Sequence, residues 1–198
     1  NSKNIPITTG VYHINEFNIQ KFKTHFFGKK LLEIVSKLPS KNILFFNEIS
    51  QKFYNSEYKG RFNNSPIAPI GIDLAKYEGI FSGIQNCRIV SIGRLTGWKT
   101  YNFQMIQMIQ LLNKKNIFLK YESYGDGPEK ENLEKIVKQE NLENQVYFHS
   151  GISYDLFKDK INNSLMFIGA GTAIIEASAC GIPALIGIEN ESESVSYG

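Results

Sequence analysis

The stretch of sequence that decides the fold runs from Ile168 to Ala177 and reads Ile-Gly-Ala-Gly-Thr-Ala-Ile-Ile-Glu-Ala. Apolar residues lead into two glycines and then into a helical pattern, so the stretch predicts a strand, a tight turn and a helix. Glycines at such a junction let the backbone approach a ligand, and the first helical amides favour an anion, most often a phosphate. Glu176 lies about one turn into the helix, where it could reach ribose hydroxyls. The alternative is that the glycines only permit tight packing while Glu176 faces solvent.

A second candidate stretch, Ser-Ile-Gly-Arg-Leu-Thr-Gly-Trp-Lys, occupies residues 91–99 at the end of another predicted strand. Arg94 and Lys99 can both turn toward one diphosphate, the first as a planar fork and the second as a point charge. Such a pair stabilises negative charge on a departing nucleoside diphosphate without a metal. The alternative is a solvated loop that carries two ordinary surface cations.

Strand and helix patterns alternate around these two stretches. The apolar spacing predicts strands at residues 7–14, 42–46, 88–92, 117–124, 146–148, 165–168 and 184–188, and helices at residues 26–38, 48–54, 101–112, 128–140, 154–160 and 172–180. Strands joined by helical crossovers form a parallel sheet with helices on both faces, so the predicted fold is α/β and Rossmann-like. Sheets of this kind bind ligands at the carboxyl ends of their strands.

Composition narrows the class of protein. The chain has 198 residues, of which 42% are hydrophobic and 21% charged, which is typical of a globular protein and excludes a fibrous or disordered one. No window approaches the ~18 apolar residues of a membrane span. The formal charge is only +3, and Lys and Glu are interspersed, which argues against a nucleic-acid partner. Two cysteines, Cys87 and Cys180, form no CxxC pair and suit a reducing compartment.

Four ordered motifs resemble one known family. They are Gly93-Arg94-Leu95 with Lys99; Gly125-Asp126-Gly127-Pro128 before an acidic helix; Val146-Tyr147-Phe148, with its glycine at Gly151; and Gly169, Gly171, Glu176, Ala177, Gly181 and Pro183. With these motifs, residues 88–188 resemble the C-terminal, donor-binding domain of the retaining GT-B glycosyltransferases of family four.

The resemblance implies transfer of a sugar from a UDP- or GDP-linked donor, with retention of anomeric configuration and with no metal or other cofactor. It implies that Arg94 and Lys99 hold the diphosphate and that Glu176 binds the ribose. The remaining donor-binding positions fall into three groups. Gly93 and Gly125 would line the donor site, and Gly151 and Ile152 would frame the base. The amides of Gly169, Ala170, Gly171 and Thr172 would meet phosphate or sugar. His13 matches a family histidine near the transferred sugar, although a lone histidine can equally be a structural hydrogen-bonding residue.

The resemblance also predicts the organisation of the chain. We expect residues 1–75 to be the tail of an acceptor-side Rossmann-like domain with its linker, and residues 76–198 to be the nucleotide-sugar-binding domain, both incomplete. The chain lacks an initiator Met and a signal peptide, so we expect a piece of a longer protein without useful turnover by itself. Ile168 stands where the family usually carries a second Glu that contacts the sugar.

The acceptor and the cellular location are predicted from the family alone. We expect a glycan or lipid-linked acceptor in bacterial surface polysaccharide synthesis, in the cytoplasm and at the inner face of the membrane. Phe22, Phe26, Phe27, Lys29 and Lys30 are candidates for peripheral membrane contact, and a buried helix face with flanking lysines explains them as well.

Two other classes of protein compete with this interpretation. Gly169 and Gly171 begin a pattern typical of NAD- or FAD-binding Rossmann units, and Glu189 follows at the spacing of a ribose-binding acid. Against this class, Ile174 stands at the third glycine position, and Arg94 and Lys99 would have no role. The third class is a non-catalytic binding module on the same fold.

Overall fold

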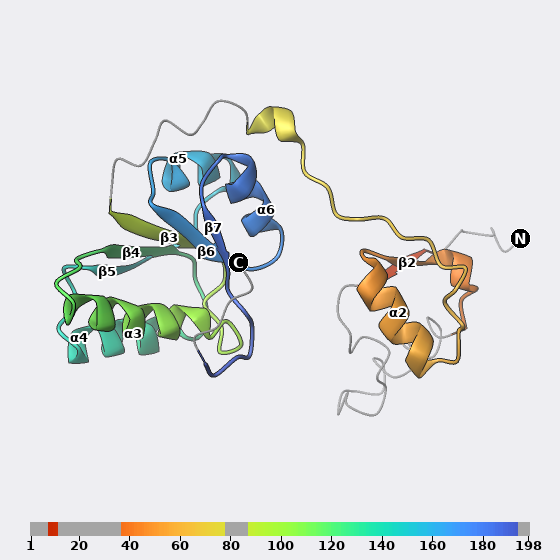
Figure 1. Cartoon of the computed structure of the whole chain (residues 1–198), viewed down its shortest axis with the longest axis horizontal. Helices are drawn as coiled ribbons and strands as arrows, with labels where there is room; N and C mark the ends of the chain where they lie inside the picture. The colour runs from red at the N-terminus through yellow and green to blue at the C-terminus, as the bar shows by residue number, and fades with distance from the viewer. Residues whose placement is uncertain (1–7, 12–36, 78–86, 194–198) are drawn as a thin grey trace, which may run out of the picture. The chain divides into compact units, whose positions relative to one another are not determined.

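The computed structural model describes residues 8–11, 37–77 and 87–193 (Figure 1). The chain divides into two compact units, Asn1–Gly71 and Ile72–Gly198. The boundary predicted from the sequence falls after residue 75, and the assignment of the first unit to an acceptor-side domain stays a prediction.

The first unit contains a short parallel strand pair and one α-helix in its described part. Strand β1 (Thr9–Val11) pairs with β2 (Ile43–Phe45), which follows the 3-10 helix η1 (Ser40–Asn42). Helix α2 (Glu48–Glu57) begins where the Asn47 side chain accepts the Ser50 N–H at 2.7 Å. The strand predicted at 42–46 and the helix predicted at 48–54 are thus confirmed. The strand predicted at 7–14 is confirmed at Thr9–Val11, and its residues 7 and 12–14, like residues 26–36 of the helix predicted at 26–38, lie outside the described residues.

The second unit is built on a five-stranded parallel sheet with the order β5-β4-β3-β6-β7. The strands are β3 (Arg88–Ile92), β4 (Lys120–Tyr124), β5 (Val146–His149), β6 (Met166–Gly169) and β7 (Ala184–Ile186). The central strand β3 has β4 on one side and β6 on the other, so the strand order reverses here: the chain adds β4 and β5 on one side of β3 and then returns to add β6 and β7 on the other, with all five strands parallel. This confirms the predicted parallel Rossmann-like sheet.

Helices cover the sheet on both faces, as Figure 1 shows. Helices α3 (Tyr101–Asn113) and α4 (Lys130–Gln139) lie on one face, and α5 (Phe157–Ile161) and α6 (Thr172–Ala179) lie on the other. Successive strand residues point to opposite cores: Ile89 packs with the α3–α4 layer and its neighbour Val90 with the α5–α6 layer. The two apolar cores, one on each face of the sheet, hold the strands in place, and the predicted site lies at the carboxyl ends of these strands.

Some predicted boundaries are wrong by a few residues. Strand β4 begins at Lys120 instead of residue 117, because the chain first closes helix α3: Asn116 adopts a left-handed φ of 59°, and the Ile117 N–H bonds back to the Leu112 carbonyl at 3.0 Å. The helix predicted at 154–160 is a 3-10 turn, η3 (Tyr154–Leu156), followed by α5.

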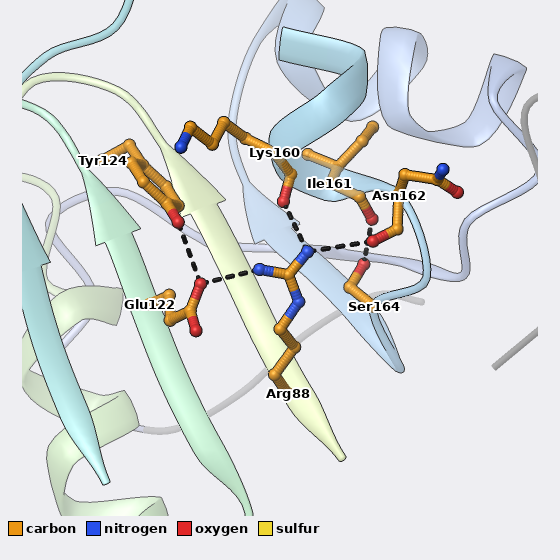
Figure 2. Close-up of polar contacts among 7 residues, drawn as sticks. All are labelled: Arg88, Glu122, Tyr124, Lys160, Ile161, Asn162 and Ser164. Atoms are coloured by element: carbon orange, nitrogen blue, oxygen red, sulfur yellow. Dashed lines mark hydrogen bonds and ion pairs between the residues drawn. The ribbon is translucent and has the colours of Figure 1, made fainter. Parts of the chain in front are cut away.

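A partly buried ion pair fastens helix α5 to the sheet, as Figure 2 shows. The Arg88 guanidinium donates to the Glu122 carboxylate at 2.7 Å and to the carbonyls of Lys160 and Asn162 at 2.8 and 2.9 Å. The Tyr124 hydroxyl donates to the same carboxylate at 2.9 Å. The Arg88 guanidinium therefore binds both a carboxylate on the sheet and carbonyl groups at the end of the helix.

In the ranges 8–11, 37–77 and 87–193, no helix is both long enough and apolar enough to cross a bilayer.

Candidate functional site

The carboxyl ends of β3 and β6 lie side by side, because these strands pair directly. The chain leaves β3 toward α3 on one face of the sheet and leaves β6 toward α6 on the other. In open parallel sheets, this reversal opens a crevice in which ligands bind. The two stretches singled out by the sequence, 91–99 and 168–177, follow these two strands.

The loop after β3 brings its two cations together. The Lys99 ammonium lies over Gly93, so close that a Cβ built on Gly93 would come within 2.9 Å of Nζ. Burial lowers the pKa of Lys99; the Glu189 carboxylate opposes this change, and the Arg94 guanidinium adds to it. Arg94 itself is exposed. Two like charges held together in this way favour the arrival of an anion between them.

The loop after β4 packs against the loop after β3 without side chains between them. A Cβ on Gly125 would come within 1.9 Å of the Gly93 carbonyl oxygen, and one on Gly127 within 2.1 Å of the Leu95 carbonyl oxygen. The Leu95 N–H donates to the Asp126 carbonyl at 3.0 Å. Only glycine fits such an approach, which explains the Gly-Asp-Gly motif physically.

Asp126 connects the loops after β4 and β5. Its Oδ2 accepts the Gly151 N–H at 2.7 Å, and its Oδ1 lies 3.4 Å from the Lys130 ammonium. The hydrogen bond from Gly151 is the main cause that lowers the pKa of Asp126. The sequence analysis includes Asp126 in a motif without giving it a role, so this function was missed although the motif contained it.

The glycine turn after β6 leads directly into helix α6. Gly171 has a left-handed φ of 69° and precedes the first helical residue. Apart from its two chain neighbours, no atom of the described residues lies within 4 Å of the position of a Cβ there. No side chain of the described residues caps the first amides of this helix. The Gly169 carbonyl accepts the Gly187 N–H at 2.7 Å, which ties the turn to the segment after β7. The turn is therefore open and its amides are available to an anion.

The segment after β7 also reaches the cation loop. The Asn190 N–H donates to the Trp98 carbonyl at 2.7 Å, and the Thr100 hydroxyl donates to the Ile188 carbonyl at 3.4 Å. Glu189 lies between these two contacts, which accounts for its electrostatic effect on Lys99. Glu189 thus borders the lysine, a placement that the spacing argument for a ribose-binding acid did not predict.

Glu176 does not face solvent. Its residue is only 8% exposed, and its Oε1 accepts a hydrogen bond from the Tyr154 hydroxyl at 2.7 Å. The Tyr154 hydroxyl in turn lies 2.5 Å from the Tyr77 hydroxyl. The alternative of a solvent-facing Glu176 is therefore wrong. Both tyrosines were missed by the sequence analysis, since nothing in the chain marks two residues so far apart as neighbours.

The other predicted positions lie as follows. Ala170 packs against the core on the α3–α4 face, and Ile152 packs against the core on the α5–α6 face. Ile168 is a buried β6 residue whose side chain fills the α3–α4 core. Thr172 is the first residue of α6. His13 lies outside the described residues, and within the described ranges no three acidic, His or Cys side chains gather as a metal site would require.

Comparison with known proteins places the chain in a family. The family model for glycosyl transferases group 1 matches residues 85–191, which is more than half of the chain. No curated protein sequence matches the chain significantly.

Several solved structures share the fold. HepE from Anabaena, solved with UDP and glucose, superposes with a TM-score of 0.67 and 17% identity over 91% of this chain and 52% of its own. A variant of S. aureus TarM was solved with fondaparinux, alpha-GlcNAc-glycerol and UDP. It superposes with a TM-score of 0.61 and 18% identity, over 83% of this chain and 34% of its own. The lipopolysaccharide outer core galactosyltransferase WaaB superposes with a TM-score of 0.54 and 15% identity, over 80% of this chain and 45% of its own.

The chain thus spans between a third and about half of the length of these three structures (34%, 45% and 52%). Their fold is the one described above, a parallel Rossmann-like sheet of the GT-B type. Together with the match of the family model over the whole sheet of the second unit, this shows that the chain belongs to the glycosyl transferases group 1 family.

Proposed function

We propose that this protein transfers a sugar from a nucleotide-sugar donor and that the second unit binds the donor. The observation that carries the proposal is the placement of the Arg94–Lys99 pair and of the open turn before α6 at the ends of two adjacent strands. A diphosphate between them would meet two cations on one side and backbone amides on the other.

The proposed roles of the site residues depend on where negative charge develops during sugar transfer. When the bond between the anomeric carbon and the diphosphate oxygen breaks, the departing nucleoside diphosphate gains negative charge. Arg94 and Lys99 stabilise that charge, and the amides of residues 171–173 add to the effect. Fixed protein cations supply what a metal would otherwise supply, so we propose a transfer that requires no metal or other cofactor. We also propose that the anomeric configuration is retained.

The donor and acceptor are proposed by chemical class. HepE and TarM were solved with UDP, which supports a UDP-linked donor, and a GDP-linked donor remains the second candidate. A glycan or lipid-linked acceptor is supported by WaaB, whose name describes transfer to lipopolysaccharide. We place the reaction in bacterial surface polysaccharide synthesis, in the cytoplasm, with peripheral contact at the inner face of the membrane.

Calorimetric titration of the chain with UDP, GDP and NAD tests the proposal. We expect binding of UDP or GDP, weakened at least ~10-fold in Arg94→Ala and in Lys99→Ala because each loses a charge-assisted contact. Lys135→Ala is the matched control, since Lys135 is an exposed cation on α4, and we expect no change. Heat with NAD alone supports the oxidoreductase alternative, and the absence of heat with all three nucleotides supports a non-catalytic module.

Turnover is a separate measurement. We propose that the 198-residue chain binds donor without transferring sugar at a useful rate, since it spans only 52% of HepE. Proton NMR of donor and acceptor mixtures measures the rate of transfer and the configuration of the product. Rates equal to those of a complete group 1 enzyme would contradict the proposal of low turnover. The anomeric coupling constant of any product reports whether the configuration is retained or inverted.

A further inference from the structure

A chain of hydroxyl groups holds the Glu176 carboxylate in place. Tyr154 donates to Oε1 of Glu176 at 2.7 Å, and the Tyr154 and Tyr77 hydroxyls are 2.5 Å apart. All three residues belong to the second unit, although they come from three separate segments: the turn after η2 (Leu74–Lys76), the start of η3, and α6.

The direction of these hydrogen bonds can be deduced. A carboxylate only accepts, so the single proton of the Tyr154 hydroxyl points at Glu176. The Tyr154 oxygen must then accept in its contact with Tyr77, and the Tyr77 hydroxyl is the donor. The order of donation is therefore Tyr77 to Tyr154 to Glu176, and each member strengthens the next.

Tyr77 is the fixed end of this chain. The residue is 4% exposed and packs in the core on the α5–α6 face. The Lys158 ammonium lies 5.9 Å from the centre of its ring and also donates to the Lys76 carbonyl. Burial, followed by the hydrogen bond to Tyr154, raises the pKa of Tyr77, so the phenol stays a neutral donor at physiological pH.

Tyr154, in contrast, is 61% exposed, yet its hydroxyl has a fixed position between two partners. Its ring borders a cavity of about 360 Å³ that Tyr77 and Lys158 also line. Packing alone does not hold such an exposed ring, so the two hydrogen bonds define its orientation. A side chain ordered by polar contacts beside a buried carboxylate is better explained by the needs of that carboxylate than by core packing.

We propose that Tyr154, held by Tyr77, is a positioning residue that fixes Glu176 through Oε1 and leaves Oε2 to accept hydrogen bonds from the ribose hydroxyls of the donor. This inference rests on the proposed function. Without Tyr154, the carboxylate gains rotational freedom, and the ribose must compete with water for a less defined acceptor.

The experiment compares two ligands across the unchanged chain and a set of variants. UDP and 2′,3′-dideoxy-UDP are titrated by calorimetry into the unchanged chain, Tyr154→Phe, Glu176→Gln and the double variant. The ratio of the two dissociation constants isolates the contribution of the ribose hydroxyls. We expect the unchanged chain to prefer UDP by ~10-fold or more, as for hydrogen bonds to a charged acceptor. The GDP pair replaces the UDP pair if GDP binds more tightly.

Tyr154→Phe should lose most of this preference while its affinity for the dideoxy ligand stays within about two-fold. In the Glu176→Gln background, the same change should have no further effect on the ratio, because Tyr154 acts through Glu176. Tyr77→Phe should lower the ratio in the same direction and to a smaller extent. Tyr147→Phe is the matched control: its hydroxyl donates to the Asn144 carbonyl on the edge strand, and the ratio should not change.

Each outcome decides between the claims. If the unchanged chain binds no nucleoside diphosphate, the proposed function fails first. If it binds UDP and dideoxy-UDP equally, or if Tyr154→Phe keeps the full preference or increases it, the positioning role is overturned while donor binding stands. Thermal unfolding of each variant shows that the comparison is made on folded protein.

Discussion

At the scale of single residues, the environment of Lys99 explains how the site can attract a diphosphate. Its ammonium is half-buried over Gly93, near Arg94 and Glu189. Burial lowers its pKa, so the loop holds a cation that is poorly solvated and available for a new partner. A diphosphate would supply the missing negative charge and restore the usual pKa.

The lowered pKa predicts a pH dependence of donor binding. Lys99 loses its proton at a lower pH than an ordinary lysine does, so UDP affinity should already fall as pH rises toward the ordinary lysine pKa. Lys99→Arg keeps its charge and should flatten the profile. Calorimetric titration across the pH series measures both proteins, with Lys135→Arg as the control. Parallel profiles for the unchanged chain and Lys99→Arg would refute the assignment of this pH dependence to Lys99.

Glycine at position 125 is required by the contact between two loops. A Cβ there would come within 1.9 Å of the Gly93 carbonyl oxygen, so Gly125→Ala must push the loops apart. We expect a loss of about 1–3 kcal/mol in the free energy of unfolding and a weaker affinity for UDP. Gly97→Ala, in the facing loop after β3, is the control, because its Cβ would meet its nearest neighbour at an ordinary 3.6 Å. Chemical denaturation compares the two, and equal stabilities would contradict the explanation.

At the scale of secondary-structure elements, the short helix α5 depends on its attachment to β3 and β4. Arg88 reaches from the start of β3 to the Glu122 carboxylate and to two carbonyls at the end of α5, as Figure 2 shows. The side chains of Arg88 and Glu122 are only 17% and 18% exposed. A helix of five residues has little stability by itself, so this anchor and the apolar contacts of Phe157 and Ile161 hold it in place.

Removal of one partner should be costly. Arg88→Met leaves the Glu122 carboxylate largely buried without its cation, and we expect a loss of about 3–5 kcal/mol in the free energy of unfolding. The double variant Arg88→Met with Glu122→Met should be more stable than Arg88→Met alone. Lys52→Met, which breaks the exposed Glu48–Lys52 pair, is the control and should cost less than about 1 kcal/mol. Denaturation curves decide the point, and an equal cost for the two single changes would show that the anchor contributes little.

The elements also show how far sequence reasoning reaches. The parallel sheet and its helices followed from apolar spacing and from breakers such as Gly181 and Pro183, because periodicity is a local property. The start of β4 could not be predicted in this way, because Asn116 closes the end of α3 with a capping turn that the apolar spacing does not reveal. The Tyr77–Tyr154 contact joins residues 77 positions apart, and only the folded chain brings them together.

At the scale of the whole molecule, the reversal of strand order between β3 and β6 gathers the candidate site. The loops after these neighbouring strands carry the cations and the open glycine turn, and hydrogen bonds from Gly187 and Asn190 tie the segment after β7 to both loops. The motif positions are therefore far apart in sequence and close at one edge of the sheet. Their placement was predictable from topology, whereas the role of Glu189 beside Lys99 was not.

This arrangement predicts donor binding without a divalent metal. In the proposed site, Arg94 and Lys99 would supply the positive charge that the diphosphate requires, so UDP affinity should be equal, within about two-fold, in EDTA and in excess Mg²⁺. Calorimetry in the two buffers makes the comparison, with the magnesium affinity of UDP itself measured as a blank. Binding that disappears in EDTA would contradict a site in which the two cations act alone.

The most direct test of the central claim is a crystal structure of the chain with UDP. We predict that the diphosphate lies between the Arg94–Lys99 pair and the amides of residues 171–173, with the ribose hydroxyls on the Glu176 carboxylate. A diphosphate bound away from the carboxyl ends of β3 and β6, or in contact with neither cation, would contradict the account.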